Sequence, residues 1–247
     1  MDDPALLRAA LAGTREFSRA VASEVHERGG VVAAVVPACP ERSMVNCVTY
    51  ESAAAVGPAL GELARIYDEA GVDAWTVWVP PGDDELAGVL EEAGHVLDAS
   101  PEAMGMDLDS VQRPPPSGAW TREGDPGVVA EINDRAYGYE GSFARALAGL
   151  DAGALRFYTA QLDGAAASCC VTVDVQADCH VTLVATLPEA RGRRLAGALM
   201  AHALVDARQR GLLTSTLVAT KMGRPVYERL GYRGVGQLEM WERRELR

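Results

Sequence analysis

The sequence predicts an α/β protein of two domains, each a central mixed, mostly antiparallel sheet flanked by helices. Three observations support this prediction. Helical and strand-like hydrophobic periods alternate along the 247 residues. A proline-rich stretch at residues 113–118 separates two parts of ordinary domain size. The pattern of elements that follows Gly71 also recurs after Gly211.

The amino-acid composition argues against several classes of function. A hydrophobic content of 48% supports full cores, and a net charge of −12 argues against a nucleic-acid partner. The chain has no apolar run long enough to span a bilayer and no signal-peptide pattern, so we expect a cytoplasmic protein without a membrane partner. Five cysteines without metal-ligand spacing predict reduced, buried thiols, and a cysteine nucleophile is the alternative. The four histidines form no His-x-x-x-His pair, so no metal is expected.

The stretch Arg-Pro-Pro-Pro-Ser-Gly at 113–118 cannot form a helix or a central strand, because its prolines lack backbone donors. We therefore expect a first domain at 1–112, a stiff linker at 113–118 and a second domain at 119–247. In the first domain the hydrophobic periods predict helices at 6–27, 53–70 and 83–93, and strands at 31–36, 44–50, 74–79, 96–97 and 103–108.

The second domain carries clearer boundary signals. Asp163-Gly164 is a typical hairpin turn, Gly211 is a helix-ending residue, and β-branched residues fill 214–219. The predicted helices are 126–137, 142–150, 191–210 and 223–230, and the predicted strands are 155–161, 165–173, 179–187, 214–219 and 232–242.

The two parts of the chain share a repeated unit. Placing Gly71 on Gly211 superimposes two strands and brings Leu90 onto Tyr227. The first copy lacks an Arg-Gly loop before its helix and lacks the hydroxyl of Tyr227. We interpret the repeat as a duplication whose first copy is degenerate, with a structural or substrate-shaping role. Chance similarity of two β-α-β units is the alternative.

The stretch from Pro188 to Met200 joins a predicted strand to a long helix. Arg191 and Gly192 lie where the strand becomes the helix. Free N–H groups and the positive end of the helix dipole make such a junction a binding place for an anion, for example a pyrophosphate. An ordinary helix start with solvated arginines is the alternative.

Residues 119–247 resemble the GNAT superfamily of N-acetyltransferases. The run from Arg191 to Ala196 is similar to the family's Arg/Gln-x-x-Gly-x-Gly/Ala loop, although Arg194 replaces the middle glycine. The segment from Tyr227 to Tyr232 resembles the closing motif Tyr-Glu-x-x-Gly-Phe/Tyr. The whole chain is similar to tandem members of the family with a degenerate N-terminal half.

The resemblance implies an acetyl-coenzyme A-dependent N-acetyltransferase that modifies a small-molecule amine or an amino acid derivative. It also implies that two central strands splay apart in the second domain and that coenzyme A binds along the freed edge. The implied cofactor-binding residues are Val184, Ala185, Thr186, Arg191, Gly192, Arg193, Arg194, Leu195, Ala196 and Gly197.

Tyr227 is the candidate general acid, because a phenol stays protonated at neutral pH and can protonate a departing thiolate. A core tyrosine is the alternative. The general base stays open among Glu140, His180, Glu239 and water, and Tyr137 and Tyr139 are candidates to line the acceptor site.

Two other functions compete with catalysis. A non-catalytic acyl-coenzyme A sensor would keep the 191–197 loop without needing Tyr227. A dinucleotide- or ATP-binding protein is disfavoured, because the loop lacks Gly-x-Gly-x-x-Gly and Gly-Lys-Ser/Thr. A monomer and a homodimer are equally open.

Overall fold

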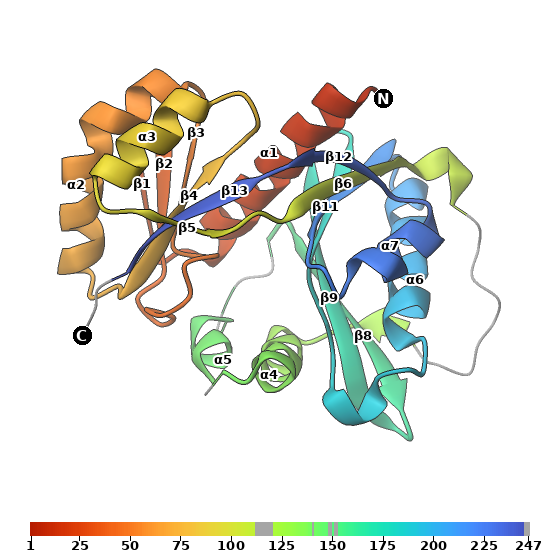
Figure 1. Cartoon of the computed structure of the whole chain (residues 1–247). Coiled ribbons are helices and arrows are strands. Elements are labelled where there is room, and N and C mark those ends of the chain that lie inside the picture. Colours follow the sequence, from red (N-terminus) through yellow and green to blue (C-terminus); the bar gives the residue numbers. More distant parts are fainter. Residues whose placement is uncertain (112–120, 140, 148–149, 151–152, 245–247) are drawn as a thin grey trace. The chain divides into compact units, whose positions relative to one another are not determined.

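The computed structural model describes residues 1–111, 121–139, 141–147, 150 and 153–244 (Figure 1). The chain divides into two compact units. We call Met1–Phe17 with Ala103–Val235 the C-terminal unit, and Ser18–Glu102 with Gly236–Arg247 the N-terminal unit. Each unit is an α/β structure on one sheet, which confirms the predicted fold class.

The C-terminal unit is built on a seven-stranded sheet of order β12-β6-β11-β10-β9-β8-β7. Its strands are β6 (Glu102–Asp107), β7 (Thr121–Glu123), β8 (Leu155–Leu162), β9 (Ala165–Val175), β10 (Asp178–Thr186), β11 (Thr214–Ala219) and β12 (Arg233–Gln237). Its helices are the first part of α1 (Asp3–Val21), then α4 (Pro126–Tyr137), α5 (Ser142–Leu147), α6 (Leu195–Gln209) and α7 (Arg224–Leu230). Figure 1 shows α4 and α5 on one face of β8 and β9, and α6 on the other.

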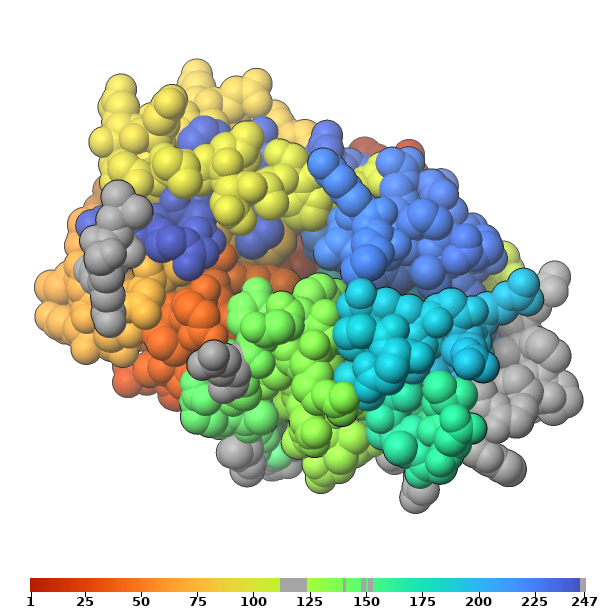
Figure 2. All heavy atoms as spheres, turned by 60° about the horizontal axis from the view of Figure 1, so that its bottom comes forward, coloured from red at the N-terminus to blue at the C-terminus, as the bar shows by residue number. Residues whose placement is uncertain are grey.

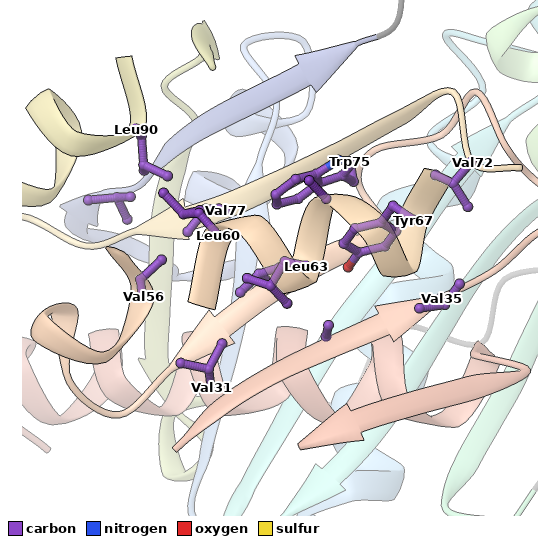
Figure 3. Packing of buried hydrophobic residues seen from close by; sticks show 14 of the residues in the cluster. Val31, Val35, Val56, Leu60, Leu63, Tyr67, Val72, Trp75, Val77 and Leu90 are labelled. Atoms are coloured by element: carbon purple, nitrogen blue, oxygen red, sulfur yellow. The ribbon is translucent and has the colours of Figure 1, made fainter. Parts of the chain in front are cut away.

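The N-terminal unit is built on a six-stranded sheet of order β1-β2-β3-β4-β13-β5. Its strands are β1 (Glu24–Arg28), β2 (Val31–Val35), β3 (Cys47–Tyr50), β4 (Ala74–Val79), β5 (Val96–Ala99) and β13 (Glu239–Arg244). Helices α2 (Val56–Glu69) and α3 (Asp84–Glu92) complete it. Figure 3 shows the core, where Tyr67 of α2 stacks on Trp75 of β4 with ring centroids 4.7 Å apart.

The two halves of the sequence exchange strands. Strand β6, from the first half, lies between β11 and β12, and β13, from the second half, lies between β4 and β5. The compact units therefore differ from the expected division at 1–112 and 119–247, because each sheet incorporates a strand from the other half. The expected linker at 113–118 lies outside the described residues.

Local structure corrects three predicted elements. The helix predicted at 6–27 ends at Val21, because residues 24–28 pair with β2 as an edge strand. The strand predicted at 232–242 is two strands, β12 and β13, which belong to different sheets. The helix predicted from residue 191 begins at Leu195, after a short 3-10 turn at Pro188–Ala190 and a loop.

The internal repeat is present in the structure. Strands β4 and β11 each begin three residues after a left-handed glycine, Gly71 with φ 69° and Gly211 with φ 91°. Each is followed by a short helix, and each pairs in parallel with one neighbour, β3 or β10. The same supersecondary unit therefore occurs once in each sheet.

Candidate active site

The parallel pairing of β10 with β11 covers only part of both strands. It runs from Asp178 opposite Thr214 to Val181 opposite Leu217 and then ends. Strand β10 continues to Thr186 and stays paired with β9 to that point. The backbone groups on the β11 side of residues 182–186 are therefore outside this ladder, which is the splay that the family resemblance implies.

A bulge lies where the splay begins. The register between β10 and β9 shifts between Thr182 and Ala185, and Leu183 has a left-handed φ of 49°. This conformation costs a non-glycine residue about 1–2 kcal/mol. The Cys169 thiol donates to the Leu183 carbonyl at 3.5 Å. Sequence reasoning missed this bulge, because leucine carries no signal for positive φ.

The end of β10 presents its backbone to the open side. The N–H of Leu187 donates to the carbonyl of Ala167 in β9 at 2.9 Å. Because backbone groups alternate along a strand, the N–H of Thr186 points to the opposite edge, where β11 has separated. The Ser168 hydroxyl donates to the Ala185 carbonyl at 2.8 Å and fixes this segment from behind.

The predicted anion loop lies between this strand and α6. Gly192 and Arg194 both have left-handed backbones, with φ of 77° and 61°, and residues 191–194 are exposed. No side chain caps the start of α6. The N–H of Ala198 is bonded to the Arg194 carbonyl, so the preceding N–H groups of the first turn have no partner within the helix.

The side chain of Arg191 has protein partners. Its Nε donates to the Thr186 carbonyl at 3.3 Å, and its Nη2 donates to the Ala136 carbonyl at 3.1 Å. The guanidinium therefore joins the end of β10 to the end of α4.

Tyr227 lies on α7 and is buried, with 7% of its surface exposed. Its ring packs at the edge of the Tyr232 ring. It also covers Gly223, where an added Cβ would lie 2.8 Å from the Tyr227 hydroxyl oxygen. Burial, with smaller contributions from Tyr137 and Cys170, raises the pKa of Tyr227 above its ordinary value of 10. The phenol is therefore protonated at neutral pH.

Tyr137 connects the end of α4 to the bulge of β10. It ends α4 and donates its hydroxyl to the Val184 carbonyl at 3.3 Å. Tyr137 also makes a small contribution to the raised pKa of Tyr227. Tyr137 and Tyr139 are both partly exposed, at 45% and 38%. The structure thus brings the Tyr137 hydroxyl to Val184 in the bulge of β10.

The three side chains considered as general bases lie in different parts of the molecule. His180 is buried beneath Gly13 of α1, burial lowers its pKa to about 4, and its Nδ1 pairs with the Thr216 hydroxyl at 3.2 Å. It is therefore a neutral core residue. Glu239 belongs to the N-terminal unit and accepts a hydrogen bond from Trp241. Glu140 lies outside the described residues.

The corresponding place in the N-terminal unit is built differently. The parallel pairing of β3 with β4 covers two residue pairs, Cys47 with Thr76 and Val48 with Val77. Beyond it, the Tyr50 hydroxyl donates to the Asp83 carboxylate at 2.7 Å, which joins the end of β3 to the start of α3. Leu90, the counterpart of Tyr227, is fully buried in the core.

The cysteines are unsuited to nucleophilic catalysis. All five are free and buried. Burial raises the pKa of Cys47 to about 11 and those of Cys169 and Cys179 to about 12, so the thiolate that would attack is scarce at neutral pH. This agrees with the expectation of buried thiols.

Within the described ranges, no cluster of three or more His, Cys, Asp or Glu side chains is arranged to hold a metal ion. No helix in the same residues combines the length and apolar character needed to cross a membrane.

Part of the sequence and most of the fold resemble those of known proteins. Residues 173–235, which contain all of β10, the anion loop, α6, β11 and α7, match the family model described as the acetyltransferase (GNAT) domain. No curated protein matches the chain in sequence.

Solved structures share their fold with most of the chain. A GCN5-related N-acetyltransferase from Kribbella flavida has a TM-score of 0.68 at 18% identity and covers 95% of both chains. A GCN5-related N-acetyltransferase from Sphaerobacter thermophilus has a TM-score of 0.57 at 18% identity, covering 87% of this chain and 76% of that one. A tandem GNAT protein from the clavulanic acid biosynthesis pathway has a TM-score of 0.57 at 15% identity, covering 88% and 81%. At these identities the matches establish a shared fold.

Proposed function

We propose that the protein is an acetyl-coenzyme A-dependent N-acetyltransferase whose active site lies in the C-terminal unit. The observation that carries the proposal is the separation of β10 from β11 next to an uncapped helix start and a buried, protonated Tyr227. The acceptor is the amine of a small molecule or of an amino acid derivative.

The residues fit the parts of acetyl-coenzyme A. The loop from Arg191 to Gly197 offers backbone N–H groups, arginines and the positive end of α6 to the pyrophosphate. The free edge of Val184, Ala185 and Thr186 can pair with the pantetheine arm as an added strand would. Bound there, acetyl-coenzyme A supplies an acetyl group activated as a thioester.

Groups of the chain itself then polarise the acetyl carbonyl and protonate the leaving sulfur. A backbone N–H at the free edge of β10 polarises the acetyl carbonyl, as the donors of an oxyanion hole do. The amine forms the new C–N bond, and the C–S bond breaks. Tyr227 donates its proton to the departing sulfur, and the proton lost from the amine passes to water. The buried neutral His180 takes no part.

The test is a Tyr227→Phe variant assayed for thiol release from acetyl-coenzyme A with a library of amines. Loss of a general acid costs about 10²- to 10⁴-fold in kcat. We expect a drop of this size with an unchanged Kd for acetyl-coenzyme A. Tyr232→Phe is the matched control: this tyrosine is also buried, but its hydroxyl pairs with Ser215, so the substitution affects stability rather than kcat.

Two results would count against the proposal. Equal kcat values for Tyr227→Phe and the unmodified protein would remove Tyr227 from the mechanism. Cofactor binding without thiol release for any amine would favour a non-catalytic acyl-coenzyme A sensor.

A further inference from the structure

The last turn of α4 is attached to the segment 184–191 through three consecutive residues. Figure 2 shows green atoms of α4 and α5 beside cyan atoms from the region of residue 190. The contacts are an ion pair of Arg135 with Glu189 at 2.9 Å, the bond from Arg191 to the Ala136 carbonyl at 3.1 Å, and the bond from Tyr137 to the Val184 carbonyl at 3.3 Å.

These three contacts differ in strength. Arg135 and Glu189 are both more than half exposed, at 53% and 60%, and such surface pairs contribute little. The bond from Tyr137 to Val184 joins two neutral groups. Arg191 makes two bonds from a charged donor, and charge-assisted bonds are the stronger class.

The two carbonyls that Arg191 reaches are ones that need a partner. Ala136 is among the last residues of α4, whose carbonyls have no partner within the helix. That end also carries the negative pole of the helix dipole, which favours a cation. Thr186 is the last residue of β10, beside the open edge. A planar guanidinium with donors in a fixed fork can bridge two such carbonyls, whereas an ammonium group is a single compact charge.

The neighbouring arginines are placed differently. Arg193 and Arg194 are exposed, and neither side chain forms an ion pair or hydrogen bond with the residues that the structure describes. They are therefore available to an incoming anion.

We propose that the Arg191 side chain is a positioning residue that caps the end of α4 and fixes it to the end of β10. Contact with the pyrophosphate then falls to the backbone of the loop and to Arg193 and Arg194. This inference rests on the proposed function, since it concerns the same site. It explains how Tyr137, Gly138 and Tyr139 are kept in register with the edge at Val184–Thr186.

The experiment compares Arg191→Gln, Arg191→Lys and Arg193→Gln in the full chain. Hydrogen exchange of the amides of Gly138 and Tyr139 reports on the last turn of α4, because both donate to the Asp134 carbonyl. Isothermal titration with acetyl-coenzyme A reports on the cofactor site. The lysine variant keeps the charge but cannot bridge both carbonyls.

We expect faster exchange at Gly138 and Tyr139 in both Arg191 variants, with a Kd for acetyl-coenzyme A within about threefold of the unmodified protein. Arg193→Gln should leave the exchange unchanged and raise Kd by about fivefold or more, because a charge near phosphate is lost.

The opposite pattern overturns the inference. A rise in Kd of about tenfold in Arg191→Gln, recovered in Arg191→Lys and without a change in exchange, would identify Arg191 as a pyrophosphate ligand and leave the proposed function intact. Failure of the unmodified protein to bind acetyl-coenzyme A would instead reject the proposed function, and the exchange data would still test the contact of Arg191 with α4.

Discussion

At the scale of single residues, left-handed backbones mark both ends of the proposed cofactor site. Among the described residues, four that are not glycine have positive φ. Two lie in the turns around β9, and the other two are Leu183 in the bulge of β10 and Arg194 at the start of α6. A non-glycine residue pays about 1–2 kcal/mol for this conformation. Strain at Leu183 and Arg194 therefore accompanies the two features on which the proposed cofactor binding depends.

Arg194→Gly should relieve one of these strains. Glycine adopts φ 61° without a steric penalty, although it also gains entropy in the unfolded chain. Arg193→Gly is the matched control, because it removes the same charge at a residue without positive φ. We expect the free energy of unfolding of Arg194→Gly to exceed that of Arg193→Gly by about 1 kcal/mol. Denaturant titration measures both, and equal values would contradict the strain.

At the scale of elements, local signals decided which parts could be predicted. Helix α4 has the predicted bounds because Asp125 caps it, Pro126 begins it and the left-handed Gly138 ends it. Strands β4 and β11 also have their predicted bounds. Strand β1 was predicted as helix, because its charged sequence continues the pattern of α1 and only pairing with β2 makes it a strand.

Prediction of the site from the sequence is limited in the same way. The anion loop and Tyr227 carry recognisable sequence patterns. The bulge at Leu183 and the two carbonyls that Arg191 binds carry none, because they depend on contacts between segments distant in sequence.

Packing of α1 on β10 allows an element-scale prediction. A Cβ added to Gly13 would lie 2.1 Å from Cγ of His180, a clash that requires the helix to move. Gly13→Ala should therefore lower the free energy of unfolding by about 3 kcal/mol. Gly61→Ala, in the exposed interior of α2 with no atom within 4 Å of the added Cβ, should raise it by about 0.5–1 kcal/mol. Thermal unfolding of both variants tests the pair, and similar shifts would refute the close contact.

At the scale of the whole molecule, the exchanged strands make the halves of the sequence interdependent. The C-terminal sheet needs β6 between β11 and β12, and the N-terminal sheet needs β13 between β4 and β5. Pairing between such distant segments leaves no mark in local sequence, so the division expected at 113–118 did not reveal it.

Fragments 1–112 and 113–247 should each lack a strand and expose unpaired edges, which promote aggregation. We expect each fragment alone to be insoluble or unfolded, and the two produced together to form a folded complex. Circular dichroism and gel filtration measure this outcome. A folded, monomeric 113–247 fragment would show that β6 is dispensable.

The central claim is that one of two repeated units kept a coenzyme A site. In the N-terminal unit, the Tyr50–Asp83 bond and Leu90 stand where the site would be. Isothermal titration of the full chain with acetyl-coenzyme A tests this claim most directly. We predict saturable binding of one acetyl-coenzyme A per chain, with no comparable binding of ATP or NAD. Absence of binding at millimolar acetyl-coenzyme A, or two equivalent sites per chain, would contradict it.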